Sequence, residues 1–497
     1  MKSNLQISGF GLALIGILLL PCVRANAQWV QTGGDIHGDA GEELGTSVSL
    51  SSDGEVLAVG APFNDSMGMS AGCAKVFEWQ DSLWMQRGET IYADTTGDRE
   101  GHSVDLSADG TLLAIGAPGN DGNGANTGRV RVFKWDGNSW NQQGQDLQGT
   151  LGPDGSELGT SVCITPDGKT IAAGGPEFSV FDAGHVRAYT WNGSQWVMKG
   201  GDFYGEFGAK LGASVSLSSS GNILAIGAPW YNGIESAGSV RIYEWNGAAW
   251  NLRGDQINGD ADGDRFGSSI GLSSDGNRLA VGDPAADSLR GQVRVYSWNG
   301  SAWVQLGADI SGAAAFDGLG YSVSLSSDGQ RLVIGSPFNA GDGVRRGLVG
   351  IYDWSSGDWI KQQDILGEHD YDGLGISVCI SADGSRLAVG APWNSDSGLD
   401  AGQVRVFEFQ QPSIVADEWQ DCCNAYPNPT TGRFSIDLGV QVAQAEVTIT
   451  DLLGRLVGTS QHHRTSELQM TIEGKPGVYF LRLTSGDKTA TLQIVKL

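Results

Sequence analysis

The stretch G-T-S-V-S-L-S-S-D-G-E-V-L-A-V-G-A-P, from Gly45 to Pro62, decides the fold expected for this chain of 497 residues. Apolar residues alternate on both sides of Asp53-Gly54, and alternation around Asp-Gly is the strongest short-range signal of a β-hairpin. We expect a type I′ turn, in which both central residues have positive φ. Because proline cannot donate to a sheet ladder, Pro62 ends the second strand.

The hairpin belongs to a unit that recurs seven times, at intervals of 53 to 58 residues. In each unit a variable loop leads to a third strand, such as V-R-V-F-K-W at Val130 to Trp135, and a fourth strand follows a short turn. Four antiparallel strands in each of seven units predict a seven-bladed β-propeller. The G-x-S-[VI] step that opens the units begins at Gly45, Gly101, Gly159, Gly212, Gly267, Gly320 and Gly375.

The seventh unit ends after its third strand, Val404 to Phe409, and has no fourth strand of its own. The segment Gln28 to Gln31, which contains Trp29 and precedes the first unit, has the sequence pattern of a fourth strand. We therefore expect residues 28–409 to form a propeller that its N-terminal strand closes, because closure removes the open edges of a sheet. The other tryptophans of this pattern occur as pairs five residues apart and are expected to pack between blades.

The two ends of the chain have other roles. Residues 1–27 are expected to be a signal peptide with Lys2, an apolar stretch and the cleavage site Ala25-Asn26-Ala27; a lipoprotein site at Cys22 is an alternative that the preceding proline disfavours. Residues 410–424 are expected to be a linker, and residues 425–497 a small β-sandwich. No later stretch approaches the roughly 18 apolar residues of a membrane span, so we expect an exported protein that does not span a membrane.

The composition excludes some partners. The formal net charge is -26, and residues 28–424 hold 22 Lys and Arg against 51 Asp and Glu. So acidic a surface argues against nucleic acid as a partner. The five cysteines after residue 27 have no recurring spacing, so they form no disulfide framework; pairing between the adjacent Cys422 and Cys423 is left open.

The strand order of each unit places the short Asp-Gly turns on one face of the ring and the long, acidic loops on the other. Binding residues tend to lie on variable loops that a rigid scaffold holds, so we expect the binding site on the face with the long loops, called the loop face below. Aromatic rings there could stack on a sugar or on a protein partner, or could simply cover the ends of the blades. The candidate ligand-binding residues, which follow the Gly-x-Pro step, are Phe63, Trp230, Phe338 and Trp393.

Acidic residues of the loops allow two interpretations. A carboxylate stands three residues before the repeated glycine in five units, and repetition favours a role in stabilising the turn. The alternate spacing of Asp260, Asp262 and Asp264 could also place oxygens around Ca²⁺, and Glu368, Asp370 and Asp372 repeat that spacing. The five repeated carboxylates are Glu42, Asp98, Asp264, Asp317 and Asp372.

Catalytic motifs are few. No histidine lies in a metal-binding spacing such as H-E-x-x-H, and the chain has no G-x-S-x-G elbow and no P-loop. The third unit is irregular, with Glu177, Asp182 and His185 where other units have bland residues, and solvated loop groups or an acid/base pair would both explain it. We name no catalytic residue and no established cofactor.

The repeat resembles the FG-GAP family, the repeat of integrin α-subunit propellers, and most closely a bacterial form with a W-x-Q-x-G strand. The resemblance covers residues 28–409 and implies adhesion or ligand binding by blade loops. Many family members carry a D-x-D-x-D-G calcium loop between the first two strands. This chain has S-S-D-G or S-A-D-G there, so that calcium site is not expected. The phenylalanine of the family name is kept only at Phe266-Gly267.

Residues 425–497 resemble a type IX secretion (Por) C-terminal sorting domain. The motifs are Y-P-N-P-T-T-G, V-T-I-T-D-L-L-G-R-L-V and P-G-V-Y-F-L-R-L. The resemblance implies passage across a bacterial outer membrane, removal of this domain, and attachment to the cell surface or release. The residues that carry it include Tyr426, Pro427, Asn428, Pro429, Gly432, Gly454, Arg455, Gly477 and Tyr479.

Taken together, these patterns predict a secreted or cell-surface binding protein whose partners are the type IX machinery and an extracellular glycan or protein. An extracellular propeller enzyme, such as a glycan hydrolase, a lyase or a quinone-dependent dehydrogenase, is the main alternative because one fold hosts many activities. Unlike polar residues that converge on the ring axis would favour catalysis, whereas an acidic, symmetric funnel would favour binding. A structural surface-layer component is the third interpretation.

Overall fold

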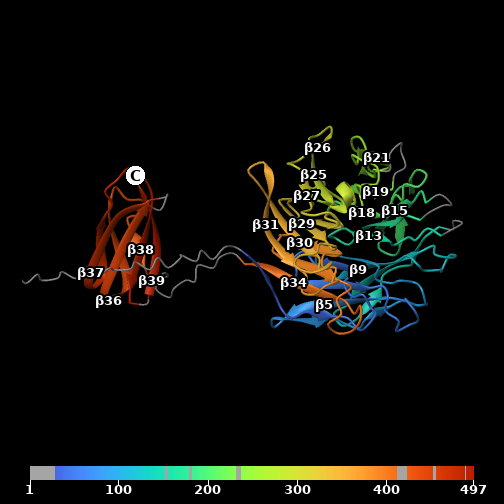
Figure 1. Ribbon diagram of the computed structural model, residues 1–497, viewed down its shortest axis with the longest axis horizontal. Helices are drawn as coiled ribbons and strands as arrows, with labels where there is room; N and C mark the ends of the chain where they lie inside the picture. The colour runs from blue at the N-terminus through green and yellow to red at the C-terminus, as the bar shows by residue number, and fades with distance from the viewer. Residues whose placement is uncertain are drawn as a thin grey trace, which may run out of the picture. The chain divides into compact units, whose positions relative to one another are not determined.

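The computed structural model describes residues 28–150, 155–177, 182–230, 237–410, 423–451, 455–486 and 488–497 (Figure 1). The expected signal peptide and most of the expected linker lie outside these residues. The chain divides into two compact units, a ring unit at Trp29–Phe409 and a tail unit that includes residues 423–497. Both units are built of β-strands, and the described residues contain a single short helix, α1 (Ala286–Leu289).

The ring unit contains seven antiparallel sheets among its described residues. We number them by chain order, so that sheet 1 begins at β3 and sheet 7 at β32. The first strand of each sheet is short and half-buried or buried. These strands are β3 (Ser47–Leu50), β8 (Ser103–Leu106), β13 (Ser161–Ile164), β18 (Ser214–Leu217), β23 (Ser269–Leu272), β28 (Ser322–Leu325) and β32 (Ser377–Ile380).

The second strands are the most deeply buried part of the ring unit. Their central residues are apolar, as expected of strands that neighbouring sheets cover on both faces, whereas some of their end residues are polar or charged. They are β4 (Val56–Ala61), β9 (Leu112–Ala117), β14 (Thr170–Gly175), β19 (Ile223–Ala228), β24 (Arg278–Asp283), β29 (Arg331–Ser336) and β33 (Arg386–Ala391).

The third strands are mostly buried in their first half and become more exposed toward their last residues. They are β5 (Cys73–Gln80), β10 (Arg129–Trp135), β15 (His185–Trp191), β20 (Ser239–Trp245), β25 (Gln292–Trp298), β30 (Leu348–Ser355) and β34 (Gln403–Gln410). The fourth strands are β1 (Gln28–Gln31), β6 (Leu83–Gln86), β11 (Trp140–Gln142), β16 (Trp196–Met198), β21 (Trp250–Leu252), β26 (Trp303–Gln305) and β31 (Asp358–Leu366).

A fifth short strand pairs with the third strand in six sheets. In sheet 6 the fourth strand β31 continues through the same region without a break. Gln363 stands there at the position where the other units have a glycine. The fifth strands are β2 (Ile36–His37), β7 (Ile91–Tyr92), β12 (Leu147–Gln148), β17 (Phe203–Tyr204), β22 (Ile257–Asn258) and β27 (Ile310–Ser311).

The turn between the first and second strands differs from the expected type I′. In sheet 1 the Gly54 N–H donates to the Ser51 carbonyl, and Gly54 has a φ of 72° while Asp53 is not left-handed. The Asp53 carboxylate instead accepts from Ser51 Oγ at 2.6 Å and from the Glu55 N–H at 3.0 Å. Because the aspartate side chain braces the loop, only the glycine needs positive φ.

The repeated G-x-S step joins each sheet to the next. Ser47 Oγ of sheet 1 donates to the carbonyl of Gly101 in sheet 2 at 2.9 Å, and the same bond recurs along the chain. The last one runs from Ser377 Oγ in sheet 7 back to the Gly45 carbonyl at 2.7 Å. The contacts between the first strands follow the same order and include a contact between β32 and β3.

The opening strand completes sheet 7. β1 lies next to β34, and the Thr32 N–H donates to the Val406 carbonyl; in Figure 1 the orange β34 lies beside the blue start of the ring unit. The side chain of Gln363, in sheet 6, donates to the Trp29 carbonyl and accepts from its N–H. Trp29 is 4% exposed and its ring is 5.5 Å from that of Phe409.

The paired tryptophans lie between sheets, as predicted. The indole N–H of Trp140 in sheet 2 donates to the Arg87 carbonyl of sheet 1 at 2.9 Å, and four other sheets repeat this bond. A Cβ on Gly88 would lie 2.6 Å from the Trp135 ring. The glycine of the W-x-Q-x-G strand therefore makes room for the tryptophan pair of the next sheet.

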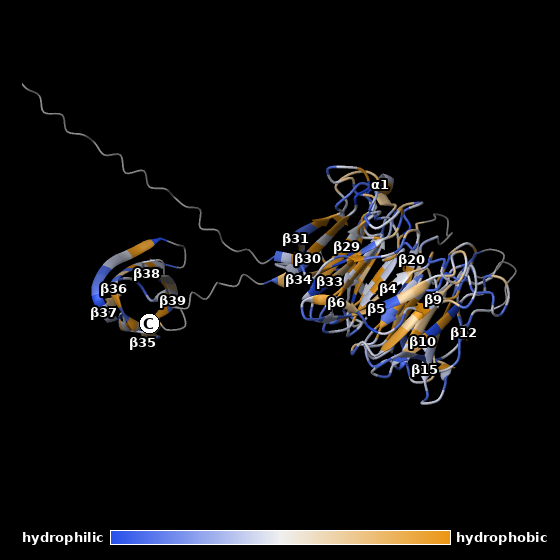
Figure 2. Ribbon diagram, turned by 90° about the horizontal axis from the view of Figure 1, so that it is seen from below, coloured by the Kyte–Doolittle hydropathy of each residue, from blue (hydrophilic) through white to orange (hydrophobic). Residues whose placement is uncertain are grey.

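The tail unit consists of β35 (Asn424–Tyr426), β36 (Arg433–Asp451), β37 (Leu456–Thr471), β38 (Gly477–Ser485) and β39 (Lys488–Lys496). Hydrogen bonds join all five strands in one sheet, where we had expected two sheets packed as a sandwich. The pairing of β36 with β37 is interrupted between Asp437 and Val442, and this break lets the long strands curve around one apolar core (Figure 2).

Candidate binding surface

The four candidate aromatic residues lie in loops between second and third strands, directly after the buried end of the second strand. Proline ends each strand there, and the next side chain emerges on the loop face. Trp230 in sheet 4 is 41% exposed. Phe63, Phe338 and Trp393, in sheets 1, 6 and 7, are half-buried.

The structure brings two of these rings together. Phe338 and Trp393 stack with centroids 6.1 Å apart and planes at 20°. Tyr321, which precedes β28, meets Phe338 edge to face at 5.8 Å. Rings in these geometries stabilise one another beyond the area that they bury. Sheets 6 and 7 therefore present an aromatic cluster that sequence reasoning identified only in part.

Trp230 has cationic neighbours. The guanidinium carbon of Arg265 lies 4.3 Å from the centre of its ring, and Lys210 Nζ lies 6.0 Å away. Cations at these distances are attracted to the face of an indole ring. Arg265 is also one of the residues that line a cavity beside the aromatic cluster, so basic side chains gather in this sector of an otherwise acidic surface.

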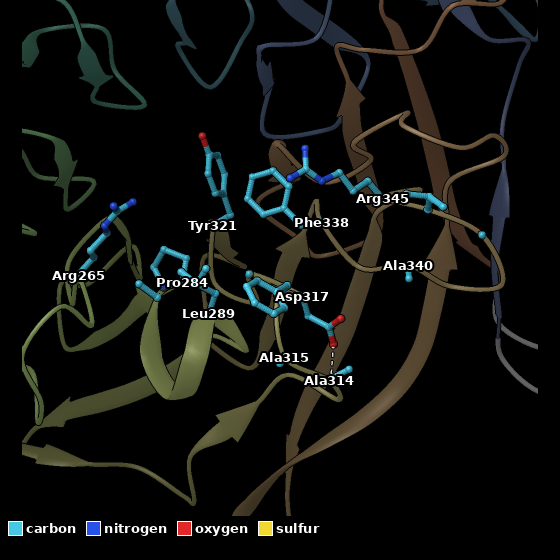
Figure 3. A pocket seen from close by; sticks show the side chains of 15 residues that line it. Arg265, Pro284, Leu289, Ala314, Ala315, Asp317, Tyr321, Phe338, Ala340 and Arg345 are labelled. Atoms are coloured by element: carbon cyan, nitrogen blue, oxygen red, sulfur yellow. Dashed lines mark hydrogen bonds between the residues drawn. The ribbon is translucent and has the colours of Figure 1, made fainter.

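The cavity beside the aromatic cluster has a volume of about 610 Å³. Figure 3 shows Tyr321 and Phe338 between the side chains of Arg265 and Arg345, with Leu289 of α1 below them. A second cavity of about 470 Å³ is lined by Arg345, Tyr371, Trp393 and Leu399, among others. Arg345 belongs to both cavities. Volumes of this size suit a small molecule or a few units of a chain.

The expected calcium ligands do not converge. Among the described residues, the one group of three acidic, histidine or cysteine side chains with ligand atoms close enough for an ion is Glu368, His369 and Asp396, all exposed. Asp260 instead pairs with Arg294 at 3.0 Å. Asp264 accepts from the Ala261 N–H at 3.0 Å. Asp260 and Asp264 are therefore engaged within the protein.

The interpretation of the repeated carboxylates as turn-stabilising residues is confirmed. Each accepts a backbone N–H from the residue three positions earlier, and each side chain is buried. Such bonds stabilise the loop that leads into the first strand. The five bonds are Asp39 N–H to Glu42, Thr95 N–H to Asp98, Ala261 N–H to Asp264, Ala314 N–H to Asp317 and His369 N–H to Asp372.

The irregular residues of sheet 3 have structural partners. Glu177 forms an ion pair with Lys210 at 2.5 Å. His185 is buried, its Nδ1 lies 3.2 Å from the Gly175 carbonyl, and burial lowers its pKa to about 4. The Asp182 carbonyl accepts the Lys210 N–H. These contacts fit the interpretation as loop and core groups.

The first strands of the sheets also bring together residues that sequence reasoning missed. In six of the seven first strands the third residue accepts an N–H from the next sheet, and in β23 this residue is Gly271. The acceptors are Ser49, Asp105, Cys163, Ser216, Ser324 and Cys379. Asp105 is the one carboxylate in this group, and burial raises its pKa to about 6. It accepts from Ser49 Oγ and from the Ile164 N–H. Its place in the same bonding pattern as serine and cysteine indicates a linking role.

The motif residues of the tail unit hold its ends together. The Asn428 side chain donates to the Gln493 carbonyl and accepts from the Val495 N–H. Tyr426 Oη donates to Glu467, and Tyr479 Oη donates to the Lys475 carbonyl. Arg455 pairs with Asp451 at 2.7 Å, whereas Gly454 lies outside the described residues. The Y-P-N-P segment, which includes Pro427 and Pro429, is thus bonded to β39. Gly432 directly precedes β36, and Gly477 begins β38.

Comparison with known families recognises this unit. Residues 424–497 match the secretion system C-terminal sorting domain. This domain marks proteins that the type IX system carries to the cell surface or the extracellular space, and the protein is therefore exported and interacts with that machinery. The model of this family does not extend to the ring unit.

No curated protein sequence matches the chain. A similar solved structure is that of a Bacteroides uniformis protein described as a 6-phosphogluconolactonase, with 14% sequence identity and a TM-score of 0.47. The match covers 65% of this chain and 86% of that one. In the described part of the chain, no helix is long and apolar enough to cross a membrane.

Proposed function

We propose that the ring unit is a seven-bladed β-propeller that binds an extracellular glycan or protein through its loop face after type IX export. The observation that carries this proposal is the aromatic cluster of Tyr321, Phe338 and Trp393 beside two cavities. The repeated serines, tryptophans and loop carboxylates of the ring unit form hydrogen bonds that stabilise the fold. This aromatic cluster, in contrast, occurs only in sheets 6 and 7 among the described residues.

The acceptor residues of the first strands favour binding over catalysis. They differ from one another, as the residues of an enzyme site would. However, Asp105, the only carboxylate described among the six acceptors, already accepts hydrogen bonds from Ser49, Leu106 and Ile164. A carboxylate that is engaged in this way is poorly placed to accept a substrate proton. The acidic surface of the ring unit also keeps an exported protein soluble.

The experiment is an array of bacterial, plant and animal glycans and of extracellular proteins, probed with the secreted protein. Substitutions Phe338→Ala and Trp393→Ala should lower binding of a true ligand about tenfold or more, because buried aromatic anchors dominate such contacts. Leu83→Ala, at an exposed residue of β6, is the control. Ligands that bind equally to all three variants would place the site elsewhere and contradict the proposal.

A further inference from the structure

Sheets 6 and 7 depart from the other five at the position four residues before the repeated glycine. Phe316 and Tyr371 stand there, and they are 65% and 57% exposed. The other five sheets have glycine at the same position. Those glycines are Gly41, Gly97, Gly155, Gly208 and Gly263.

The backbone explains why glycine is usual. All seven residues are left-handed, with φ of 70° at Phe316, 69° at Tyr371 and 71° to 86° at the five glycines. A bulky side chain is strained in this conformation. Because both rings are largely exposed, burial does not offset the strain. The other five sheets place their left-handed side chain two residues later, at Glu43, Arg99, Glu157, Lys210 and Arg265. Phe316 and Tyr371 differ because the left-handed side chain is an exposed aromatic ring, and an exposed ring beside a cavity is suited to stacking on a ligand.

A second exchange accompanies the first. Two residues before the repeated glycine, sheets 6 and 7 have Gly318 and Gly373, where the other five sheets have charged side chains. A Cβ on Gly318 would lie 2.8 Å from the Phe338 ring, and a Cβ on Gly373 would clash with Trp393. Each of the two sheets therefore combines an exposed ring in the loop with a half-buried ring that rests on a glycine.

Arg345 lies beside the aromatic rings of both sheets. It lines the cavity that Phe316, Tyr321 and Phe338 share, and also the cavity that Tyr371 and Trp393 share. Its guanidinium carbon is 5.5 Å from the centre of the Phe338 ring. Arg265 stands at the far side of the first cavity (Figure 3). Two similar aromatic sites thus share one cation. Carboxylates line them as well: Asp317 of the first cavity is buried, Asp370 of the second pairs with Arg346 at 3.1 Å, and Asp400 also lines the second.

We infer that the two cavities are adjacent subsites for successive units of an acidic oligosaccharide, whose carboxylate or sulfate groups bind Arg345 and Arg265. This inference rests on the proposed function and specifies its ligand. The flat apolar face of a sugar ring can stack on an exposed aromatic ring, and guanidinium groups recognise carboxylate and sulfate through paired hydrogen bonds. Against a repulsive acidic surface, local cations would make binding selective for the correct site.

The test measures binding of the secreted full chain to tetragalacturonate, to a heparin-derived tetrasaccharide and to neutral maltotetraose by titration calorimetry. At least one acidic probe should bind about tenfold or more tightly than the neutral one, and the better acidic probe identifies carboxylate or sulfate as the group bound. Phe316→Gly and Tyr371→Gly should each weaken acidic binding about tenfold. Arg345→Gln should remove the preference for acidic over neutral probe.

Two controls keep the test decisive. Phe316→Gly and Tyr371→Gly restore the residue found in five sheets and relieve the strain at positive φ, so their melting temperatures should be no lower than that of the unchanged protein. Met69→Ala, at an exposed residue of the sheet 1 loop, should leave binding unchanged. Equal affinity for acidic and neutral probes, no binding of any of the three, or acidic binding that survives both glycine variants would overturn the inference. The proposed function would still stand if the array had found another ligand that Phe338→Ala or Trp393→Ala weakens.

Discussion

Single residues of the ring unit show where one repeat differs from the others. Asp283 occupies a position at the end of β24 where four other sheets have alanine. Its side chain is fully buried, and Arg294 Nη2 lies 3.3 Å from its carboxylate. Burial, together with the nearby Asp264, outweighs the guanidinium and raises the pKa of Asp283 to about 8. The folded protein therefore favours the protonated carboxyl.

This shift predicts a pH-dependent stability. Between about pH 4 and pH 8 the folded chain holds a proton that the unfolded chain has released, so this residue lowers the free energy of unfolding as pH rises through that window. Asp283→Ala should remove the effect while Arg294 keeps Asp260 as a partner. The variant should gain at least about 1 kcal/mol over the unchanged protein between pH 5 and pH 9.

Tryptophan fluorescence in a denaturant titration would measure this gain, because 15 of the 16 tryptophans lie in residues 29–409. Glu89→Ala, at an exposed side chain, is the matched control and should show no such gain. A difference between Asp283→Ala and the unchanged protein that stays constant with pH would contradict the assignment.

Sequence reasoning at this scale succeeded where residues repeat. The five carboxylates before the repeated glycine were predicted as turn residues because one role explains all of them. The turn type was wrong because the Asp53 side chain supplies bonds that a type I′ backbone would not need. Phe316 and Tyr371 were missed, although an alignment of the seven units would have shown them in place of glycine, because the sequence does not show that their rings are exposed beside cavities.

Among the elements, the short first strand of each sheet also links that sheet to the next one. One serine in each first strand donates to the next sheet, so the link is part of every unit. The glycine of the second strand, such as Gly60, leaves room for this link, since a Cβ there would clash with the carbonyl of Gly101. The G-x-S step and the Gly-x-Pro step are thus two halves of one contact between sheets.

This contact predicts the cost of opening the ring. Ser377→Ala removes the bond to Gly45 that joins sheet 7 to sheet 1, and it should lower the free energy of unfolding by about 1 kcal/mol. Ser269→Ala removes the same bond between sheets 5 and 6 and should have an equal effect, as measured by denaturant titration. If Ser377→Ala had no effect while Ser269→Ala destabilised the protein, the two sheets would not be joined in solution.

At the scale of the whole molecule, export is assigned to the tail unit, and the proposed binding belongs to the ring unit. The tail unit carries its own apolar core and its own motif, so its removal should leave the ring unit intact. A chain that ends at residue 410 should remain inside the outer membrane of a host with type IX secretion, whereas the full chain should reach the surface or the medium. Cell fractionation with an antibody to the ring unit measures this, and secretion of the shortened chain would contradict it.

The large features could be predicted because they rest on a repeat in the ring unit and on specific motifs in the tail unit. The units, the place of Trp29 beside Phe409 and the sorting domain all follow from motifs that are long enough to be specific. The cavities could not be predicted, since each is formed by loops of two neighbouring sheets whose side chains meet only in three dimensions. The single sheet of the tail unit was missed because the sequence pattern of one long, bent strand resembles that of two shorter strands.

The strand from Gln28 to Gln31 ties the two ends of the ring unit into sheet 7. This sheet can be finished only when residues near both ends are present together, so its closing step depends on contacts between the most distant parts of the chain. Until then β34 offers an unpaired edge to any segment of the right pattern. The opening strand of a second molecule has that pattern, and an exchange of these strands would link two rings as a swapped dimer.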